Sequence, residues 1–127
     1  MTIAVVAAVV ERDDCFLLTK RQAGVHLEGH WEFPGGKVHA GEAHQAALVR
    51  EMLEELDVAV EVGERVLDTT HDYSDRRVHL HFYRCTLKGA PRPLIGQEMR
   101  WVPRAELRTL PFPEADAVLI ERLSTSG

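Results

Sequence analysis

The N-terminal part of the chain alternates between apolar runs and turn-forming residues. Residues 3–11 are rich in Val and Ala, Asp13 and Asp14 favour a turn, and residues 15–20 are apolar again. This pattern predicts a strand, a hairpin turn and a second strand. Residues 21–41 are a predicted long loop with a short strand at 31–33, because Gly and Pro occur there too often for a helix or a regular strand. Loops of this length in compact domains are usually functional.

Residues 43–56 show the clearest helical pattern. Val49, Met52, Leu53 and Leu56 follow the spacing i, i+3, i+4, i+7, which predicts a helix with one apolar face.

The rest of the chain predicts a second hairpin, a further strand and two more helices. The hairpin pairs the segments 58–70 and 78–87 around a turn in 71–77. A loop at 88–96, a strand at 97–102, a short helix over 103–107 and a second full helix over 114–123 complete the chain. Hairpins separated by helices predict an α/β fold, with helices on the faces of a mixed sheet. We expect residues 1–127 to form a single domain, because no repeat or linker interrupts them.

The composition agrees with a folded domain, and the net charge limits the classes of molecule that it could bind. Hydrophobic residues make up 45% of the chain and charged residues 28%, which supplies enough apolar material for a core. The chain has 15 Lys and Arg against 20 Asp and Glu, a formal net charge of −5. A nucleic acid polymer is disfavoured as a partner, because its binding surface needs a basic footprint. A single nucleotide is not excluded, because a bound metal can neutralise one triphosphate locally.

The two cysteines and the length of the longest apolar run indicate the cellular compartment of the protein. Cys15 and Cys85 cannot form a disulfide framework and lack the spaced partners of a structural zinc site, so we interpret them as buried thiols. The apolar run 3–10 is far shorter than the roughly 20 residues of a membrane span, and no basic segment precedes it. We therefore expect no membrane association and a cytoplasmic protein. The sequence leaves a monomer and a homodimer open.

Three glutamates share one face of the predicted central helix. At about 100° per residue, Glu54 and Glu55 fall within about 60° of Glu51. A solvated face is the ordinary interpretation of an acidic helix. Here no Lys or Arg follows any of the three by three or four positions, and the acids lie in the last turns, where the helix dipole disfavours negative charge. Two carboxylates about 6 Å apart repel by nearly 3 kcal/mol at an effective dielectric constant of about 20. The arrangement favours a hard divalent cation, Mg²⁺ or Mn²⁺, shared with substrate phosphates.

The preceding loop supports this interpretation. Gly35 and Gly36 allow the backbone to come close to a ligand, and Lys37 directly after them favours contact with phosphate. The phosphate loop of nucleoside triphosphatases, the dinucleotide-binding glycine pattern and the nucleophile elbow of serine hydrolases are all absent. Glycines, a base and clustered carboxylates together indicate metal-assisted attack of water on a phosphoanhydride.

The same residues form one spaced pattern. Gly36, five residues, Glu42 and seven residues precede the run Arg50-Glu51-Met52-Leu53-Glu54-Glu55-Leu56-Asp57-Val58. This pattern resembles the box of the Nudix family, and only Asp57 departs from it, in place of Gly. The resemblance implies a Nudix fold, an α/β/α sandwich around a mixed sheet, that hydrolyses a nucleoside diphosphate linked to another group and uses Mg²⁺ or Mn²⁺.

The resemblance also implies a role for each residue of the box. Glu51, Glu54, Glu55 and the Gly36 carbonyl are the implied metal ligands, Arg50 orients a carboxylate, and Glu42 braces the loop. Glu54 and Glu55 both stay open as the general base. Helices commonly end in a left-handed residue at the position of Asp57, and Asp tolerates that conformation at a cost of about 1 kcal/mol. We expect lower stability there, not lost chemistry.

Outside the box, the chain is similar to the MutT-type nucleoside triphosphate pyrophosphohydrolases over most of its length. By that likeness, the base and sugar pocket is lined by Arg21, Phe33, Arg76 and Asp116. MutT-like proteins often have an acid immediately before a Gly-Gln pair, as a further metal ligand or base. Ile95 stands there in this chain, and Glu98 is the nearest substitute.

Asp116 bears on the substrate. An Asn both donates and accepts hydrogen bonds, as the O6 and N7–H edge of 8-oxoguanine requires, whereas an ionised Asp only accepts and suits the amine of cytosine. A protonated Asp116 would still read 8-oxoguanine. We expect hydrolysis of a (deoxy)nucleoside triphosphate to monophosphate and pyrophosphate, with 8-oxo-dGTP as the leading substrate, which would sanitise the nucleotide pool. CTP or a methylated cytidine triphosphate is the alternative.

Two other functions remain as rivals. A catalytically silent nucleotide sensor would keep the fold, but a pure binder has no need for three clustered glutamates. A dinucleotide polyphosphate or a nucleotide sugar would be a diphosphate-linked substrate, which product analysis separates. His79 and His81 alternate on one strand face and are interpreted as half-buried sheet residues rather than metal ligands, and Tyr73 as a structural residue.

Overall fold

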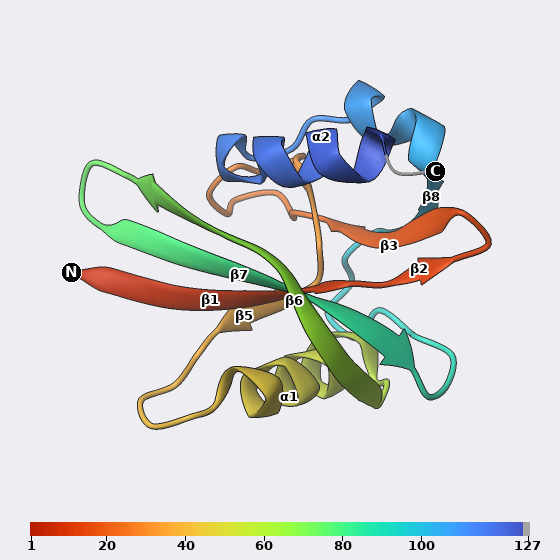
Figure 1. Cartoon of the computed structure of the whole chain (residues 1–127), viewed down its shortest axis with the longest axis horizontal. Coiled ribbons are helices and arrows are strands. Elements are labelled where there is room, and N and C mark those ends of the chain that lie inside the picture. Colours follow the sequence, from red (N-terminus) through yellow and green to blue (C-terminus); the bar gives the residue numbers. More distant parts are fainter. Residues whose placement is uncertain (126–127) are drawn as a thin grey trace.

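Strands fill the middle of the molecule, with a helix on either side (Figure 1). The computed structural model describes residues 1–125. Helix α1 (His44–Leu56) covers one face of the strands, and helix α2 (Ala117–Thr125) lies on the other side. The predicted α/β sandwich is confirmed. Within the described residues, no helix is long and apolar enough to cross a lipid bilayer.

The larger sheet is mixed and has the strand order β5-β1-β7-β6. β1 (Thr2–Val9) and β7 (Arg77–Leu87) are parallel neighbours at its centre, and β5 (Gly35–Lys37) and β6 (Val60–Asp72) pair antiparallel at its edges. Alternate residues of β1 contribute to the two hydrophobic clusters on opposite faces of this sheet. Both faces are buried, which is why the N-terminal run is apolar at successive positions.

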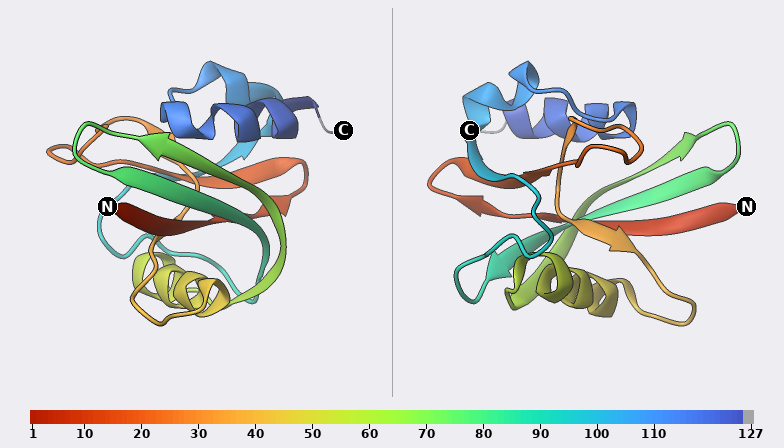
Figure 2. Two further views of the ribbon diagram at one scale, coloured as in Figure 1. Left: turned by 60° about the vertical axis from the view of Figure 1, so that its left-hand side comes forward. Right: turned by 180° about the vertical axis from the view of Figure 1, so that it is seen from behind.

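The smaller sheet joins β2 (Glu11–Arg12), β3 (Cys15–Lys20) and β4 (Trp31–Glu32), and β8 (Met99–Pro103) pairs with β3. The predicted turn is confirmed, since Asp13 and Asp14 have φ angles of 52° and 62°. A two-residue hairpin turn with both central residues left-handed matches the twist of its strands. The second predicted hairpin is also confirmed, and β6 bends across the molecule at register shifts between Val62 and Leu67 (Figure 2).

Several expected elements differ from the structure. β5 forms inside the predicted loop, because its pairing with β1 uses main-chain groups and leaves no side-chain pattern in the sequence. The helix expected over 114–123 begins as a 3₁₀ turn, η2 (Glu114–Asp116), and the short helix after Pro103 is the 3₁₀ helix η1 (Arg104–Thr109). Leu53, expected on the apolar face of α1, is 47% exposed. The buried residues of that helix are Ala47, Leu48, Met52 and Leu56.

The C-terminal end of α1 is held by its cap and by the loop that follows β7. Asp57 adopts the expected left-handed conformation, with φ 49° and ψ 42°, and its N–H donates to the carbonyl of Leu53. The Leu94 N–H and the Gln97 side-chain amide both donate to the carbonyl of Glu55, at 3.0 and 3.1 Å. The turn that carries the glutamates is therefore fixed against the rest of the fold.

Candidate active site

Arg50 connects the glycine-rich loop to helix α1. Its guanidinium donates to both carboxylate oxygens of Glu42, at 2.9 and 3.0 Å, to Glu51 at 2.9 Å and to the Lys37 carbonyl at 2.9 Å. Glu42 also accepts the backbone N–H of His39 at 2.9 Å. The hydrogen bond from Arg50, followed by that from His39, lowers the pKa of Glu42 to about 2. The brace that the sequence predicted is therefore an ionised pair at neutral pH.

The three glutamates of the box have different surroundings. The Glu51 side chain is only 14% exposed and lies against Gly36, whereas the Glu54 side chain is 58% exposed and approaches Arg50 at 3.4 Å. Glu55 is half-buried and lines a second cavity together with Glu32. The helix thus presents one carboxylate to the loop, one to solvent and one to the interior.

Glu55 holds a proton unless positive charge compensates it. Burial raises its pKa to about 9, and a hydrogen bond with Glu51 and the negative charges of Glu51, Glu32 and Glu54 act in the same direction. Carboxylates that repel each other in this way are stabilised in their ionised form by a divalent cation. The atoms of these glutamates that could bind a metal ion are all oxygens, which fits Mg²⁺ or Mn²⁺.

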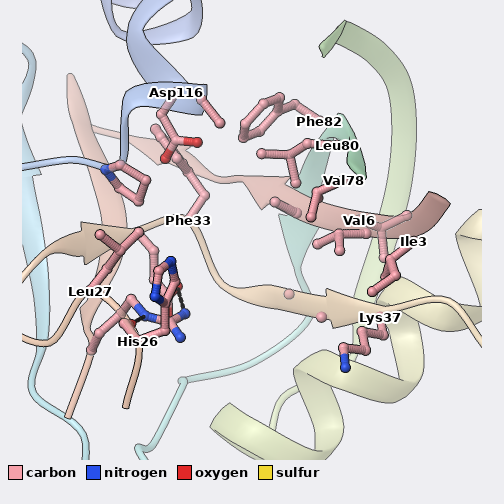
Figure 3. Close-up of a pocket in the computed structure, with 18 of the residues that line it drawn as sticks. Ile3, Val6, His26, Leu27, Phe33, Lys37, Val78, Leu80, Phe82 and Asp116 are labelled. Atoms are coloured by element: carbon pink, nitrogen blue, oxygen red, sulfur yellow. Dashed lines mark hydrogen bonds and ion pairs between the residues drawn. The ribbon is translucent and has the colours of Figure 1, made fainter. Parts of the chain in front are cut away.

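A cavity of about 270 Å³ lies beside the glycine-rich loop and is also lined by Glu32 (Figure 3). Asp116 lies at one end of it and Lys37 at the other, and Gly36 contributes to its wall. Phe33, the residue after β4, also lines it, and its ring centroid is 6.0 Å from that of Phe112 in a stacked arrangement and 5.9 Å from that of Phe82 in an edge-on one. A cavity with aromatic and aliphatic walls and a few polar groups is typical of a small-molecule site.

Asp116 is the buried acid of this cavity. Its relative exposure is 4%, and burial, with a smaller contribution from Glu32, raises its pKa to about 7. At neutral pH, Asp116 therefore populates both a form that donates a hydrogen bond and a form that only accepts.

The two predicted pocket arginines also line the cavity. Arg21 pairs with Glu32 at 2.8 Å and donates to the carbonyl of His26 at 2.5 Å. The guanidinium of Arg76 lies over the ring of Tyr73 at 5.8 Å, and its Nε is buried without a hydrogen-bond partner in the described part of the chain. A buried donor of this kind is available to a ligand.

Glu98 lies beside the smaller cavity, since its partner Lys20 and its neighbour Gln97 line that cavity together with Glu55. Its side chain is 55% exposed, pairs with Lys20 at 3.9 Å and is not among the residues that line the two cavities described above. Glu32 lines both cavities, and its charge acts on Glu55 and Asp116. Glu32 was not predicted as a site residue, and Tyr73, interpreted from the sequence as structural, also lines the larger cavity. A glutamate between Trp31 and Phe33, just before the Pro-Gly-Gly turn, was the available signal.

Comparison with known proteins gives a consistent result. A NUDIX domain model matches residues 5–122. The chain is 39% identical over 120 residues to a CTP pyrophosphohydrolase of Escherichia coli, covering 94% of this chain and 89% of the relative. It is 40% identical over 120 residues to a putative 8-oxo-dGTP diphosphatase 2 of Mycobacterium tuberculosis, covering 88% and 81%.

Solved structures agree with the sequence relatives. The solution structure of the Escherichia coli ORF135 protein is 39% identical, with a TM-score of 0.85 over 94% of this chain and 86% of that protein. A MutT NUDIX hydrolase from Burkholderia pseudomallei is 28% identical, with a TM-score of 0.85 over 95% and 97%.

Proposed function

This chain belongs to the Nudix hydrolase family, and we propose that it hydrolyses (deoxy)nucleoside triphosphates to nucleoside monophosphates and pyrophosphate. One observation carries the proposal: Gly36 lines the cavity and also lies against the carboxylate of Glu51. The cavity and the carboxylates of α1 therefore meet at Gly36. A nucleoside in the cavity directs its phosphates toward Lys37 and the glutamates of α1. The relatives named as a CTP pyrophosphohydrolase and a putative 8-oxo-dGTP diphosphatase support this class of substrate.

Mg²⁺ or Mn²⁺ is the cofactor in this proposal. The Gly36 carbonyl and the carboxylates of Glu51, Glu54 and Glu55 would hold it, and the high pKa of Glu55 in the metal-free protein fits a site that needs added positive charge. When bound, such a cation neutralises phosphate charge and lowers the pKa of a coordinated water.

The chain's own residues bind and orient the substrate. Arg50 fixes the position of Glu51 and ties the loop to the helix through Glu42. Lys37 lies at the phosphate end of the cavity, and Arg76 offers a buried N–H that has no partner among residues 1–125. Glu54 or Glu55 accepts the proton of the attacking water. Glu98 stays a proposed further metal ligand or base, and its partner Lys20 lines the smaller cavity together with Glu55.

Asp116 decides between bases. Its protonated form donates to O6 of 8-oxoguanine and accepts from N7–H, so 8-oxo-dGTP is the leading substrate. Its ionised form only accepts and suits the amine of cytosine, which makes CTP or a methylated cytidine triphosphate the second candidate. The pKa of about 7 keeps both forms populated at neutral pH.

A pyrophosphate-release assay with Mg²⁺ and a panel of normal and oxidised nucleotides tests the proposal. We expect monophosphate and pyrophosphate as products, and Glu54→Gln to lower kcat/KM by about 100-fold or more, since changes even to outer-shell partners of a metal site cost about 10- to 100-fold. Glu61→Gln, an exposed glutamate on β6, is the matched control and should leave activity unchanged. Nucleotide binding without turnover would instead identify a sensor, and cleavage of diphosphate-linked compounds alone would identify the other rival.

A further inference from the structure

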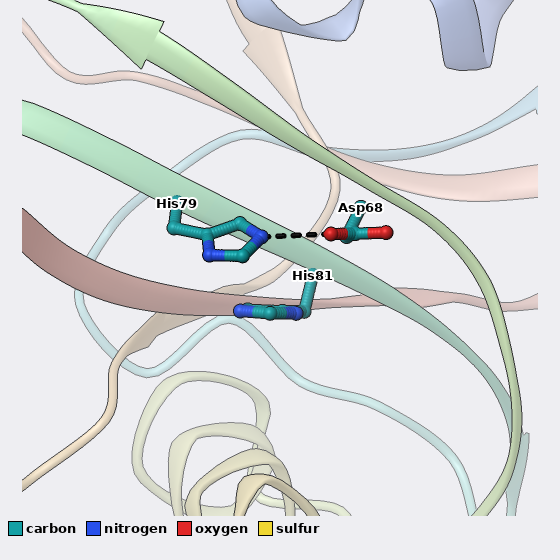
Figure 4. Close-up of side chains that lie close together, drawn as sticks. All are labelled: Asp68, His79 and His81. Carbon is teal, nitrogen blue, oxygen red and sulfur yellow. Dashed lines mark hydrogen bonds and ion pairs between the residues drawn. The ribbon is translucent and has the colours of Figure 1, made fainter.

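A second group of metal-ligating side chains lies on the face of the larger sheet opposite the cavity. Asp68 on β6 and His79 and His81 on β7 each present a ligand atom, and these atoms all lie within 4.8 Å of one another (Figure 4). Side chains alternate between the faces of a strand, and the β7 residues that line the cavity are Val78, Leu80 and Phe82. The group therefore lies on the other face of the sheet from the cavity that the proposed function uses, and its three residues are not among the proposed magnesium ligands.

The strand register fixes this group. His81 lies directly opposite Asp68 in the antiparallel β6–β7 pair, and His79 lies opposite Thr70, two residues further along the same face. The Nε2 atom of His79 is 2.8 Å from a carboxylate oxygen of Asp68, and the rings of His79 and His81 have their centroids 4.0 Å apart. Backbone hydrogen bonds thus hold two imidazoles and a carboxylate together.

His81 supplies an independent observation. Its relative exposure is 6%, and its Nδ1 atom is buried without a hydrogen-bond partner in the described residues. Buried polar atoms in folded proteins are nearly always paired, so this nitrogen needs an explanation. Burial, followed by the nearby rings of His79 and His44, lowers the pKa of His81 to about 4. A neutral imidazole has a lone pair on one ring nitrogen, which is the form that binds metals.

Neighbouring groups complete the surroundings. The ring of His44, the first residue of α1, lies 4.3 Å from that of His81, and its Nδ1 is 2.9 Å from the Tyr83 hydroxyl. The charge of Arg65 acts on both Asp68 and His81 and opposes a cation, whereas the Asp68 carboxylate favours one. The group therefore consists of the Asp68 carboxylate and the imidazoles of His79 and His81, with the imidazole of His44 at its edge.

We propose that Asp68, His79 and His81 form a binding site for a transition-metal ion of the zinc class, distinct from the magnesium carboxylates. Two imidazoles and one carboxylate suit Zn²⁺, Co²⁺ or Ni²⁺, whereas Mg²⁺ takes oxygen ligands. Bonds of about 2.0–2.1 Å require ligand atoms roughly 3.4 Å apart. The widest separation, up to 4.8 Å, must therefore close by up to about 1.4 Å, and the His79–Asp68 pair at 2.8 Å must open slightly as the ion replaces its hydrogen bond. Three protein ligands leave a further position for water.

Cobalt titration of the full chain without an affinity tag tests this site. With Mg²⁺ in excess to occupy the oxygen ligands, we expect Co²⁺ to give visible absorption bands of a nitrogen-ligated ion at one equivalent, and Zn²⁺ to displace it. His79→Gln and Asp68→Asn should each weaken binding by more than about tenfold, which is the range found even for outer-shell partners of a metal site. His71→Gln is the matched control, because it removes a histidine from the opposite face of the same hairpin.

The variants separate the outcomes. His79 and Asp68 have side-chain exposures of 36% and 42%, so their substitutions test the site without disturbing the core, as a change of buried His81 would. Absence of saturable Co²⁺ binding would overturn the proposal. Equal binding by His79→Gln and the parent would overturn it too, as would binding that is lost in Glu51→Gln but kept in His79→Gln, since the ion would then sit at the carboxylates of α1.

Discussion

The carboxylate of Glu51 lies directly against the α-carbon of Gly36. A β-carbon at position 36 would be 2.5 Å from the carboxyl carbon of Glu51 and 2.6 Å from each of its oxygens, closer than real side-chain contacts. The Gly36 carbonyl and the Glu51 carboxylate are proposed ligands of one cation. The missing side chain at position 36 is what lets the loop and the helix come this close together.

Replacing Gly36 with Ala should therefore abolish most activity while the protein stays folded. The added methyl group displaces Glu51 by about an ångström, and a misplacement of that size costs about 100-fold in rate. Gly89→Ala is the matched control, because a β-carbon there meets only Val58, at 3.9 Å. Steady-state kcat/KM and the circular dichroism spectrum of both variants check this. A Gly36→Ala enzyme with normal kcat/KM would disprove the proposed contact of loop and helix at the metal.

Mg²⁺ binding should release a proton from Glu55. Its pKa of about 9 in the metal-free protein means that the cation must displace that proton at neutral pH. We expect the affinity for Mg²⁺ to rise with pH up to about 9, and Glu55→Gln to remove this dependence. Calorimetry in buffers of different ionisation enthalpy counts the released protons. Binding without proton release at pH 7 would show that Glu55 is already ionised.

The same raised pKa predicts how the stability of the metal-free protein depends on pH. The folded state binds the Glu55 proton more tightly than the unfolded state, whose pKa is about 4.5. The free energy of unfolding should therefore fall as the pH rises from about 4.5 toward 9. Glu55→Gln should flatten this slope, and denaturant titrations at several pH values with a chelator present measure it.

Asp57 should cost stability without affecting chemistry. The left-handed conformation at the end of α1 disfavours any residue with a β-carbon, and the Asp57 carboxylate pairs with exposed Arg92 rather than with the active site. Asp57→Gly and Asp57→Ala both lose that pair, so their difference isolates the backbone conformation. We expect the Gly variant to be more stable than the Ala variant by about 1 kcal/mol in denaturant titrations. Equal stability would argue against the left-handed cap.

The sequence predicted most of the elements that carry side-chain patterns. The 3.6-residue spacing identified α1, and the turn residues identified both hairpins, because periodicity and turn chemistry are local properties. β5 was missed because it pairs with β1 through main-chain groups alone. The exposure of Leu53 was missed because a helical wheel does not show which way the helix lies on the sheet.

Candidate residues within one segment were easier to predict than contacts between segments. The resemblance to the Nudix box implied that Glu42 braces the loop, and the structure shows the hydrogen bonds from Arg50 to Glu42 and to the Lys37 carbonyl. Glu32 and Glu55 line the same cavity from two elements that are far apart in the sequence, and sequence spacing does not reveal such a contact. The grouping of Asp68 with the two histidines depends on the β6–β7 register, and one strand read alone does not reveal it.

Base preference should change with pH through Asp116. With a pKa of about 7, the protonated fraction falls from about 0.9 at pH 6 to about 0.1 at pH 8. The kcat/KM for 8-oxo-dGTP relative to CTP should therefore fall strongly over this range, by up to about 100-fold, because the two bases use opposite forms of the acid. Taking the ratio cancels pH effects on the shared phosphate chemistry.

Asp116→Asn should make the ratio independent of pH, whereas Glu114→Gln, an exposed neighbour in the same 3₁₀ turn, should keep the parent's dependence. A constant ratio in the parent enzyme would show that Asp116 does not read the base by its protonation state.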